Sequence, residues 1–210
     1  AQIQYNYVDV DYQAGRKGLK LAADRGLAVV VMEPLRGGRI AKVPPPEPVD
    51  KVWEQSDRDW NPVEWALHWV LDQPEVSTAL SGMSEMSHVE ENLAIASESQ
   101  VGKLSEADHE IIREARKSYF NSAPIPCTQC EYCLPCPSGV AIPRIFDIYN
   151  DAVAYDAWGH AHWAYNNPLK PEERADQCIE CGECEAVCPQ HIEIIDWLAR
   201  VHEALAQPAE

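Results

Sequence analysis

The 210-residue chain has few basic side chains, no long apolar run, and no cysteine before residue 127. The chain has 17 Lys and Arg residues and 34 Asp and Glu residues, which gives a net charge of −17. That balance argues against a nucleic-acid partner or an anionic lipid surface, because phosphate contacts need clustered cations. No stretch approaches the ~18 apolar residues of a membrane span, so we expect no membrane insertion. The first residues, 1–6, also lack the basic-then-apolar pattern of a signal peptide.

Cysteine and charge divide the chain into two chemically different parts. All eight cysteines lie within the last 84 residues. Residues 1–122 carry 13 basic and 20 acidic side chains, whereas residues 123–210 carry 4 and 14. The turn-rich residues 121–124 favour a boundary there. We therefore predict a first domain over 1–104, a connecting helix over 105–122, and a second domain over 123–210.

The first part alternates between segments with strand signals and segments with helix signals. In the clearest helix Asn61 suits the N-cap and Pro62 the first turn. We expect strands over 2–8, 27–32 and 76–80, and helices over 15–25, 61–73, 87–96 and from Ser105 onward. Because such alternation with short turns is typical of βα units, the sequence predicts an α/β fold with a parallel sheet.

Local signals add detail to these elements. Gly26 suits a left-handed helix stop, and Ser87 with Glu90 predicts a capping box. The continuous apolar run over 27–32 indicates a strand that is covered on both faces. The proline-rich segment over 43–48 predicts a loop that is neither helix nor central strand.

Three segments in this order resemble the C-terminal part of an aldo/keto reductase. They are LAVVVMEPLRGG at 27–38, EWALHWVLDQP at 64–74 and STALSGMSEMSHVEENLAIA at 77–96. The family folds as a (β/α)8 barrel with a nicotinamide cofactor at the C-terminal ends of its strands. The resemblance implies that residues 1–8, 27–32 and 76–81 are the sixth, seventh and eighth strands.

The resemblance also implies a set of NAD(P) contacts. Gln2 matches the glutamine that contacts the nicotinamide amide, and Met32 stands where many members have a stacking tyrosine. Gly82 and His88 stand where many members have a lysine and an arginine for the 2′-phosphate, so the choice between NADP and NAD stays open. The complete implied set is Gln2, Met32, Pro34, Leu35, Gly37, Gly82, His88, Glu91 and Asn92.

No segment matches the family's first four strands, which carry its catalytic tetrad, so we assign no catalytic residue. Three strands cannot close an eight-stranded barrel, and they leave two sheet edges. The chain is the C-terminal piece of a longer polypeptide, or a partner subunit supplies the other strands, or the barrel part is a remnant that serves for docking. We favour the first alternative.

The eight cysteines form two closely spaced series. The first is Cys127-x2-Cys130-x2-Cys133-x2-Cys136-Pro137, and the second is Cys178-x2-Cys181-x2-Cys184-x3-Cys188-Pro189. The second series is the bacterial ferredoxin pattern, and the first differs from it by one residue. Two-residue gaps let a curled loop aim three thiolates at one cubane, while the fourth thiolate reaches the other cluster. Structural zinc prefers separate C-x2-C pairs, and disulfides are odd in a chain without an export signal.

This part therefore resembles two-cluster ferredoxins, and we predict two [4Fe–4S] clusters. The first is assigned to Cys127, Cys130, Cys133 and Cys188. The second is assigned to Cys178, Cys181, Cys184 and Cys136.

Helical spacing on both sides of the second series predicts a mostly helical module. The spaced apolar residues lie over 142–149 and 194–205. We interpret Trp158, Trp163 and Tyr165 as core residues that shield a cluster from water. We interpret His160 and His162 as non-ligands, and His191 as a turn residue with a hydrogen bond to a cluster sulfur as the alternative.

Together the two resemblances indicate a cytoplasmic iron–sulfur oxidoreductase of aldo/keto reductase type, a combination known from anaerobes and their relatives. Its clusters would relay single electrons, and its barrel part would contribute to an NAD(P) and substrate site. The alternatives are a non-catalytic electron-transfer subunit, which docks through the barrel remnant, and a scaffold in which the clusters only hold the fold. The acidic charge predicts a redox partner protein with a basic docking face.

Overall fold

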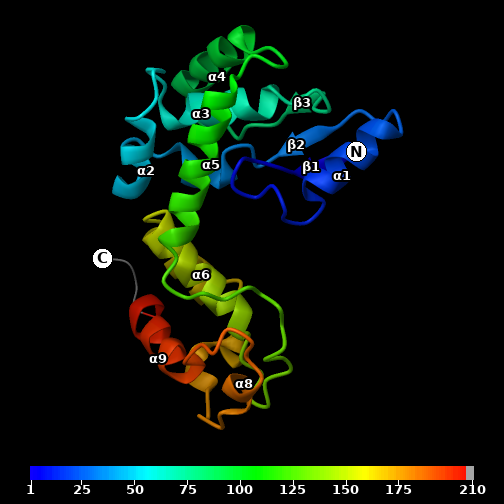
Figure 1. Cartoon of the computed structure of the whole chain (residues 1–210). Helices are drawn as coiled ribbons and strands as arrows, with labels where there is room; N and C mark the ends of the chain where they lie inside the picture. The colour runs from blue at the N-terminus through cyan, green and yellow to red at the C-terminus, as the bar shows by residue number, and fades with distance from the viewer. Residues whose placement is uncertain (207–210) are drawn as a thin grey trace. The chain divides into compact units, whose positions relative to one another are not determined.

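The computed structural model describes residues 1–206 and divides the chain into two units, Ala1–Tyr119 and Phe120–Glu210. Figure 1 shows the helices and strands of both units. No helix within residues 1–206 combines the length and the apolar character that crossing a membrane requires.

Unit 1 contains one sheet of three short parallel strands. They are β1 (Gln2–Gln4), β2 (Val30–Met32) and β3 (Thr78–Ala79), in the order β1-β2-β3. Ile3 pairs with Val31, and Val31 pairs with Ala79. The predicted parallel arrangement and strand order are confirmed, although each strand is shorter than expected.

The β2 strand is covered on one face only, contrary to the expectation for residues 27–32. Val29 and Val31 are fully buried, whereas Val30 is only partly buried and Met32 is 36% exposed. The side chains therefore alternate between a covered face and an open face among the described residues. The continuous apolar run over residues 27–32 predicted that both faces of this strand are buried. The helices within residues 1–206 cover only one of them.

The helices of unit 1 follow the expected positions with two corrections. Ser87 lies inside a helix that starts at Met86 and has no side-chain cap, so the predicted capping box is wrong. Residues 47 and 48 begin a helix, because Pro48 is tolerated in a first turn. The helical elements are α1 (Gly15–Asp24), the 3-10 segment η1 (Arg36–Ala41), α2 (Glu47–Trp53), α3 (Pro62–Leu71), α4 (Met86–Glu98) and α5 (Glu106–Asn121).

Two helix ends use the predicted capping chemistry. The Asn61 side chain accepts from the backbone N–H groups of Val63 and Glu64, and the Glu64 carboxylate accepts from the Asn61 N–H. Gly26 has φ +70° after α1, where its N–H donates to the Ala23 carbonyl at 2.8 Å. Only glycine adopts this left-handed conformation without strain.

The core of unit 1 is rich in aromatic side chains around α3. Trp53 stacks on the fully buried Trp65 with ring centroids 4.8 Å apart, and Tyr5 lies 5.1 Å from Trp69. Because α3 has neighbours on several sides, it buries more of its surface than the single predicted stripe. Helix α3 also contacts η1, which follows β2, together with β3 and α4, which follows β3.

Unit 2 is mostly helical, as predicted, and residues 120–206 contain no β-strand. Helices α6, α7 and α9 pack on one another around buried Ile145, Phe146 and Leu198. Figure 1 shows α6 and α9 as the two long helices of this unit. The elements are α6 (Ile142–Ala154), α7 (Trp158–Asn166), the 3-10 turns η2 (Pro171–Glu173) and η3 (Ala175–Gln177), α8 (Glu183–Ala186) and α9 (Ile194–Leu205).

Candidate iron–sulfur and nucleotide sites

Both cysteine series lie on tightly curled loops. Gln129 and Glu131 in the first loop have positive φ values, as do Glu180 and Gly182 in the second. Non-glycine residues rarely adopt positive φ, and such residues cluster at functional sites. The repeated left-handed turns curl each loop, so that cysteines three residues apart face the same side.

The first of two small cavities in unit 2 collects cysteines from both series. Its walls include the thiols of Cys127, Cys130 and Cys133 from the first series and of Cys188 from the second. The remaining lining is largely apolar and comes mainly from the start of α6 and the segment that leads into α9. The structure thus groups the four cysteines that the sequence assigns to one cluster.

The second cavity holds the complementary set. Its walls include Cys136 from the first series and Cys178, Cys181 and Cys184 from the second. Ile142 at the start of α6 lines both cavities. Each series therefore gives three cysteines to one cavity and its fourth to the other, which is the crossed arrangement of two-cluster ferredoxins.

The donor chemistry of both cavities fits iron–sulfur clusters. All eight cysteines are free thiols. Within residues 1–206, no group of three or more His, Cys, Asp or Glu is close enough to hold a single metal ion. A cubane places one thiolate on each of four irons, so its ligands lie farther apart than the ligands of one zinc ion. The assignment of each thiolate to a particular cluster stays a prediction.

Burial controls the protonation of several of these thiols in the chain itself. It raises the pKa of Cys184 to about 11, although a backbone N–H of Glu185 opposes the rise. Burial also raises the pKa values of Cys127 and Cys133. Bound metal reverses this preference, because a coordinating thiol is deprotonated outright.

The aromatic and histidine predictions in unit 2 have mixed outcomes. Tyr165 is fully buried, but Trp158 and Trp163 are 38% and 56% exposed, and none of the three lines a cysteine cavity. The interpretation of the two tryptophans as core residues is therefore wrong: α7 turns them outward. His162 contacts the Leu205 carbonyl at 3.1 Å, and His191 has φ +51° in an exposed turn.

Unit 1 has a larger cavity, of about 650 Å³, at the C-terminal ends of β2 and β3. Its walls come from the segment after β2, the turn after β3 and the first half of α4. Gln2 and Met32 do not line it. Seven of the nine implied nucleotide contacts do: Pro34, Leu35, Gly37, Gly82, His88, Glu91 and Asn92.

Hydrogen bonds hold the polar side chains of α4 in this cavity. Glu91 accepts from the Asn61 side chain at 2.8 Å, and Asn92 donates to the Ser81 hydroxyl at 3.0 Å. Thus the residue that caps α3 also orients Glu91. Helix α4 starts at Met86, and no side chain caps its first turn.

Sequence reasoning missed a buried polar network beside this cavity. Asn6 and Asp9 follow β1: Asn6 donates to Asp9 and to the Glu33 carbonyl, and Asp9 pairs with Arg36, which follows β2. Neither hydrophobic periodicity nor a local motif links residues 27 positions apart. The only available signal was that polar side chains follow two neighbouring parallel strands.

Comparison with known families agrees with the two-part organisation. Residues 1–117 match the model of the aldo/keto reductase family. The chain belongs to the aldo/keto reductase family. Residues 126–193 of this family member match the model of a 4Fe-4S dicluster domain. The protein is therefore a fusion of an aldo/keto reductase part with an iron–sulfur module, as the sequence predicted.

Two solved structures are similar to part of this aldo/keto reductase family member. One is aldo-keto reductase AKR11C1 from Bacillus halodurans in its holo form, with 23% identity and a TM-score of 0.43. The match covers 54% of this chain and 41% of that one. The apo form of the same protein matches with 23% identity and a TM-score of 0.43, over 54% of this chain and 42% of that chain. The chain thus spans less than half the length of these structures. No curated protein matches it.

Proposed function

We propose that the protein is an iron–sulfur oxidoreductase of aldo/keto reductase type. In this proposal two [4Fe–4S] clusters relay single electrons, and unit 1 contributes to an NAD(P) and substrate site. The observation that carries it is the sorting of eight free cysteines into two cavities of four. Each bound cluster would accept and release one electron at a time.

Unit 1 supports the nucleotide half of the proposal through its cavity. Its volume of about 650 Å³ falls within the range of small-molecule sites, roughly 300–1,000 Å³. Glu91 and Asn92 would bind the adenosine end, and the 34–38 segment would lie beside the pyrophosphate. Within residues 1–206, β1 and β3 each pair on one side only. A further segment or subunit that completes the barrel would cover those edges.

The cluster half of the proposal calls for a partner protein. Nicotinamide gives two electrons as hydride, whereas each cubane takes one, so direct exchange needs an intermediary such as a flavin. We propose that the clusters instead exchange electrons with a redox partner. The chain's charge of −17 becomes more negative with two cubanes of about −2 each. A basic docking face on the partner complements that charge.

Binding of NAD(P)H separates this function from the alternative of a non-catalytic electron-transfer subunit. Purified, iron-replete full chain should enhance or quench NADPH fluorescence in a saturable way. Dithionite should bleach its cluster absorbance. Reduction without NADPH binding would favour the electron-transfer subunit, and clusters that dithionite does not reduce would contradict both.

Replacing His88 with arginine should shift nucleotide preference toward NADPH. His88 lines the cavity at a position where many family members carry an arginine for the 2′-phosphate. A guanidinium binds phosphate through charge-assisted hydrogen bonds, so we expect NADPH affinity to rise about tenfold. NADH affinity should stay unchanged. Both affinities are measured by fluorescence titration.

Ser87 provides the matched control for this change. It is the exposed neighbour of His88 and does not line the cavity. Ser87→Arg adds the same charge and should leave the preference unaltered. An equal gain from Ser87→Arg, or an equal gain for NADH, would show that the added charge acts without a specific phosphate contact.

A further inference from the structure

The loop over residues 33–38, which follows β2, has an uncommon backbone. Glu33 has φ +54° and Arg36 has φ +50°, and the glycines at 37 and 38 have φ +62° and +85°. Left-handed conformations cost little at glycine but are strained at the two charged residues. Such strain persists only where surrounding contacts over-determine it. The loop therefore needs an anchor outside itself.

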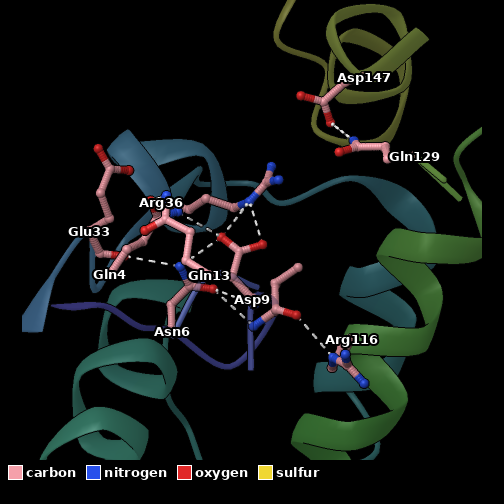
Figure 2. Close-up of polar contacts among 10 residues, drawn as sticks. Gln4, Asn6, Asp9, Gln13, Glu33, Arg36, Arg116, Gln129 and Asp147 are labelled. Atoms are coloured by element: carbon pink, nitrogen blue, oxygen red, sulfur yellow. Dashed lines mark hydrogen bonds and ion pairs between the residues drawn. The ribbon is translucent and has the colours of Figure 1, made fainter. Parts of the chain in front are cut away.

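Five of the six residues in the 33–38 loop line the 650 Å³ cavity, and Arg36 is the exception. Its Nε donates to both carboxylate oxygens of Asp9, at 3.0 and 3.2 Å. The arginine thus turns away from the cavity while its neighbours on both sides form the wall. Figure 2 shows this ion pair.

The Asp9 carboxylate is well buried and has several donors. Its residue is 9% exposed, and the Arg36 side chain is 15% exposed. Asn6 Nδ2 donates to Asp9 Oδ2 at 3.1 Å, and Gln4 Nε2 donates to the same oxygen at 3.3 Å. A buried ion pair with extra hydrogen bonds is costly to break, because one lost partner leaves an uncompensated charge.

Asn6 joins the segment after β1 to the beginning of the 33–38 loop. It is fully buried, and its Nδ2 also donates to the Glu33 carbonyl at 3.1 Å. Its Oδ1 accepts from the backbone N–H groups of Val8 and Asp9, at 3.0 and 2.9 Å. One amide thereby fixes Asp9 locally and holds the first strained residue of the loop. Figure 2 shows Asn6, Asp9, Glu33 and Arg36 converging.

We propose that Asn6, Asp9 and Arg36 form a latch that holds the 33–38 loop in its strained form and so positions the cavity wall for its ligand. None of the three lines the cavity, so they are positioning residues that act through the loop backbone. The positioning role rests on the proposed nucleotide site, whereas the hold on the loop stands on the contacts alone.

The test compares Asp9→Asn and Arg36→Gln with a variant of another buried ion pair. Asp108 in unit 1 is 5% exposed and receives two hydrogen bonds from Arg58, and it does not line the cavity. Asp108→Asn therefore removes the same kind of charge without touching the latch. Two quantities are measured on each iron-replete full chain: amide hydrogen exchange over residues 33–41 and NADPH affinity by fluorescence.

Both latch variants should speed exchange over residues 33–41 at least about tenfold and weaken NADPH binding about tenfold. Asp108→Asn should change neither quantity, even though it lowers stability. Unchanged exchange over 33–41 would overturn the latch, as would equal effects from Asp108→Asn. Faster exchange with unchanged NADPH affinity would overturn its positioning role. If the unmodified chain binds no NADPH, the proposed nucleotide function fails, and the exchange data alone decide whether the latch holds the loop.

Discussion

Replacing Cys127 and Cys188 together with alanine should leave about four irons per chain, half of the about eight expected for two cubanes. The two cysteines belong to different series, but they line the same cavity. Losing both therefore removes one cluster and leaves the complete ligand set of the other. Each single variant should already lose that same cluster, so the double variant should be no worse than either one.

A second pair of variants serves as the matched control. Cys184 and Cys188 belong to the same series but line different cavities. The Cys184→Ala, Cys188→Ala double variant should lose both clusters and retain almost no iron. Iron and acid-labile sulfide analysis of reconstituted protein checks both results. The opposite result would be loss of all iron from the Cys127, Cys188 double variant and retention of half the iron by the Cys184, Cys188 double variant. It would show that each cysteine series binds its own cluster.

Replacing Asp108 with asparagine should lower the free energy of unfolding at pH 7 by about 2 kcal/mol, roughly a 30-fold change in the equilibrium constant. Hydrogen bonds from Arg58 lower the pKa of this buried carboxyl from 3.8 to about 2, and Ser105 adds two more. Because the folded state holds the ionised form, this stabilisation is complete above pH 3.8. It is lost as the pH falls toward about 2.

Urea unfolding of the full chain between pH 7 and pH 2 measures this difference. The gap between the unmodified chain and Asp108→Asn should close as the pH falls. Glu110→Gln on the same helix is the control: Glu110 is exposed and pairs with Arg113 at the surface, where ion pairs contribute little. A gap that keeps its size at pH 2, or no gap at pH 7, would contradict the expected effect.

The features that the sequence predicted best depend on local chemistry. Asn61 caps α3 because a side-chain amide next to Pro62 can reach the first free N–H groups of that helix. Each cysteine series encodes its own curled loop through spacing alone. The grouping of the eight cysteines into two sets of four could be predicted only from the crossed pattern of two-cluster ferredoxins. Nothing in either series by itself specifies which cysteines share a cluster with Cys136 or Cys188.

The features that sequence reasoning missed depend on which side chains meet across the fold. The apolar character of Met32 suggested a covered face, but cover depends on elements far away in the sequence. Trp158 and Trp163 are large and apolar, yet α7 turns them outward. Asp9 and Arg36 are ordinary charged residues until parallel pairing of β1 with β2 brings their loops together.

We propose that the cysteine-rich unit holds two [4Fe–4S] clusters that carry single electrons. Iron analysis and quantitative electron paramagnetic resonance of the dithionite-reduced full chain measure the number of clusters and their reduction. We expect about eight irons and about two unpaired-electron centres per chain, with magnetic interaction between the two centres. About four irons with a single isolated signal, or a full iron content that gives no signal on reduction, would contradict it.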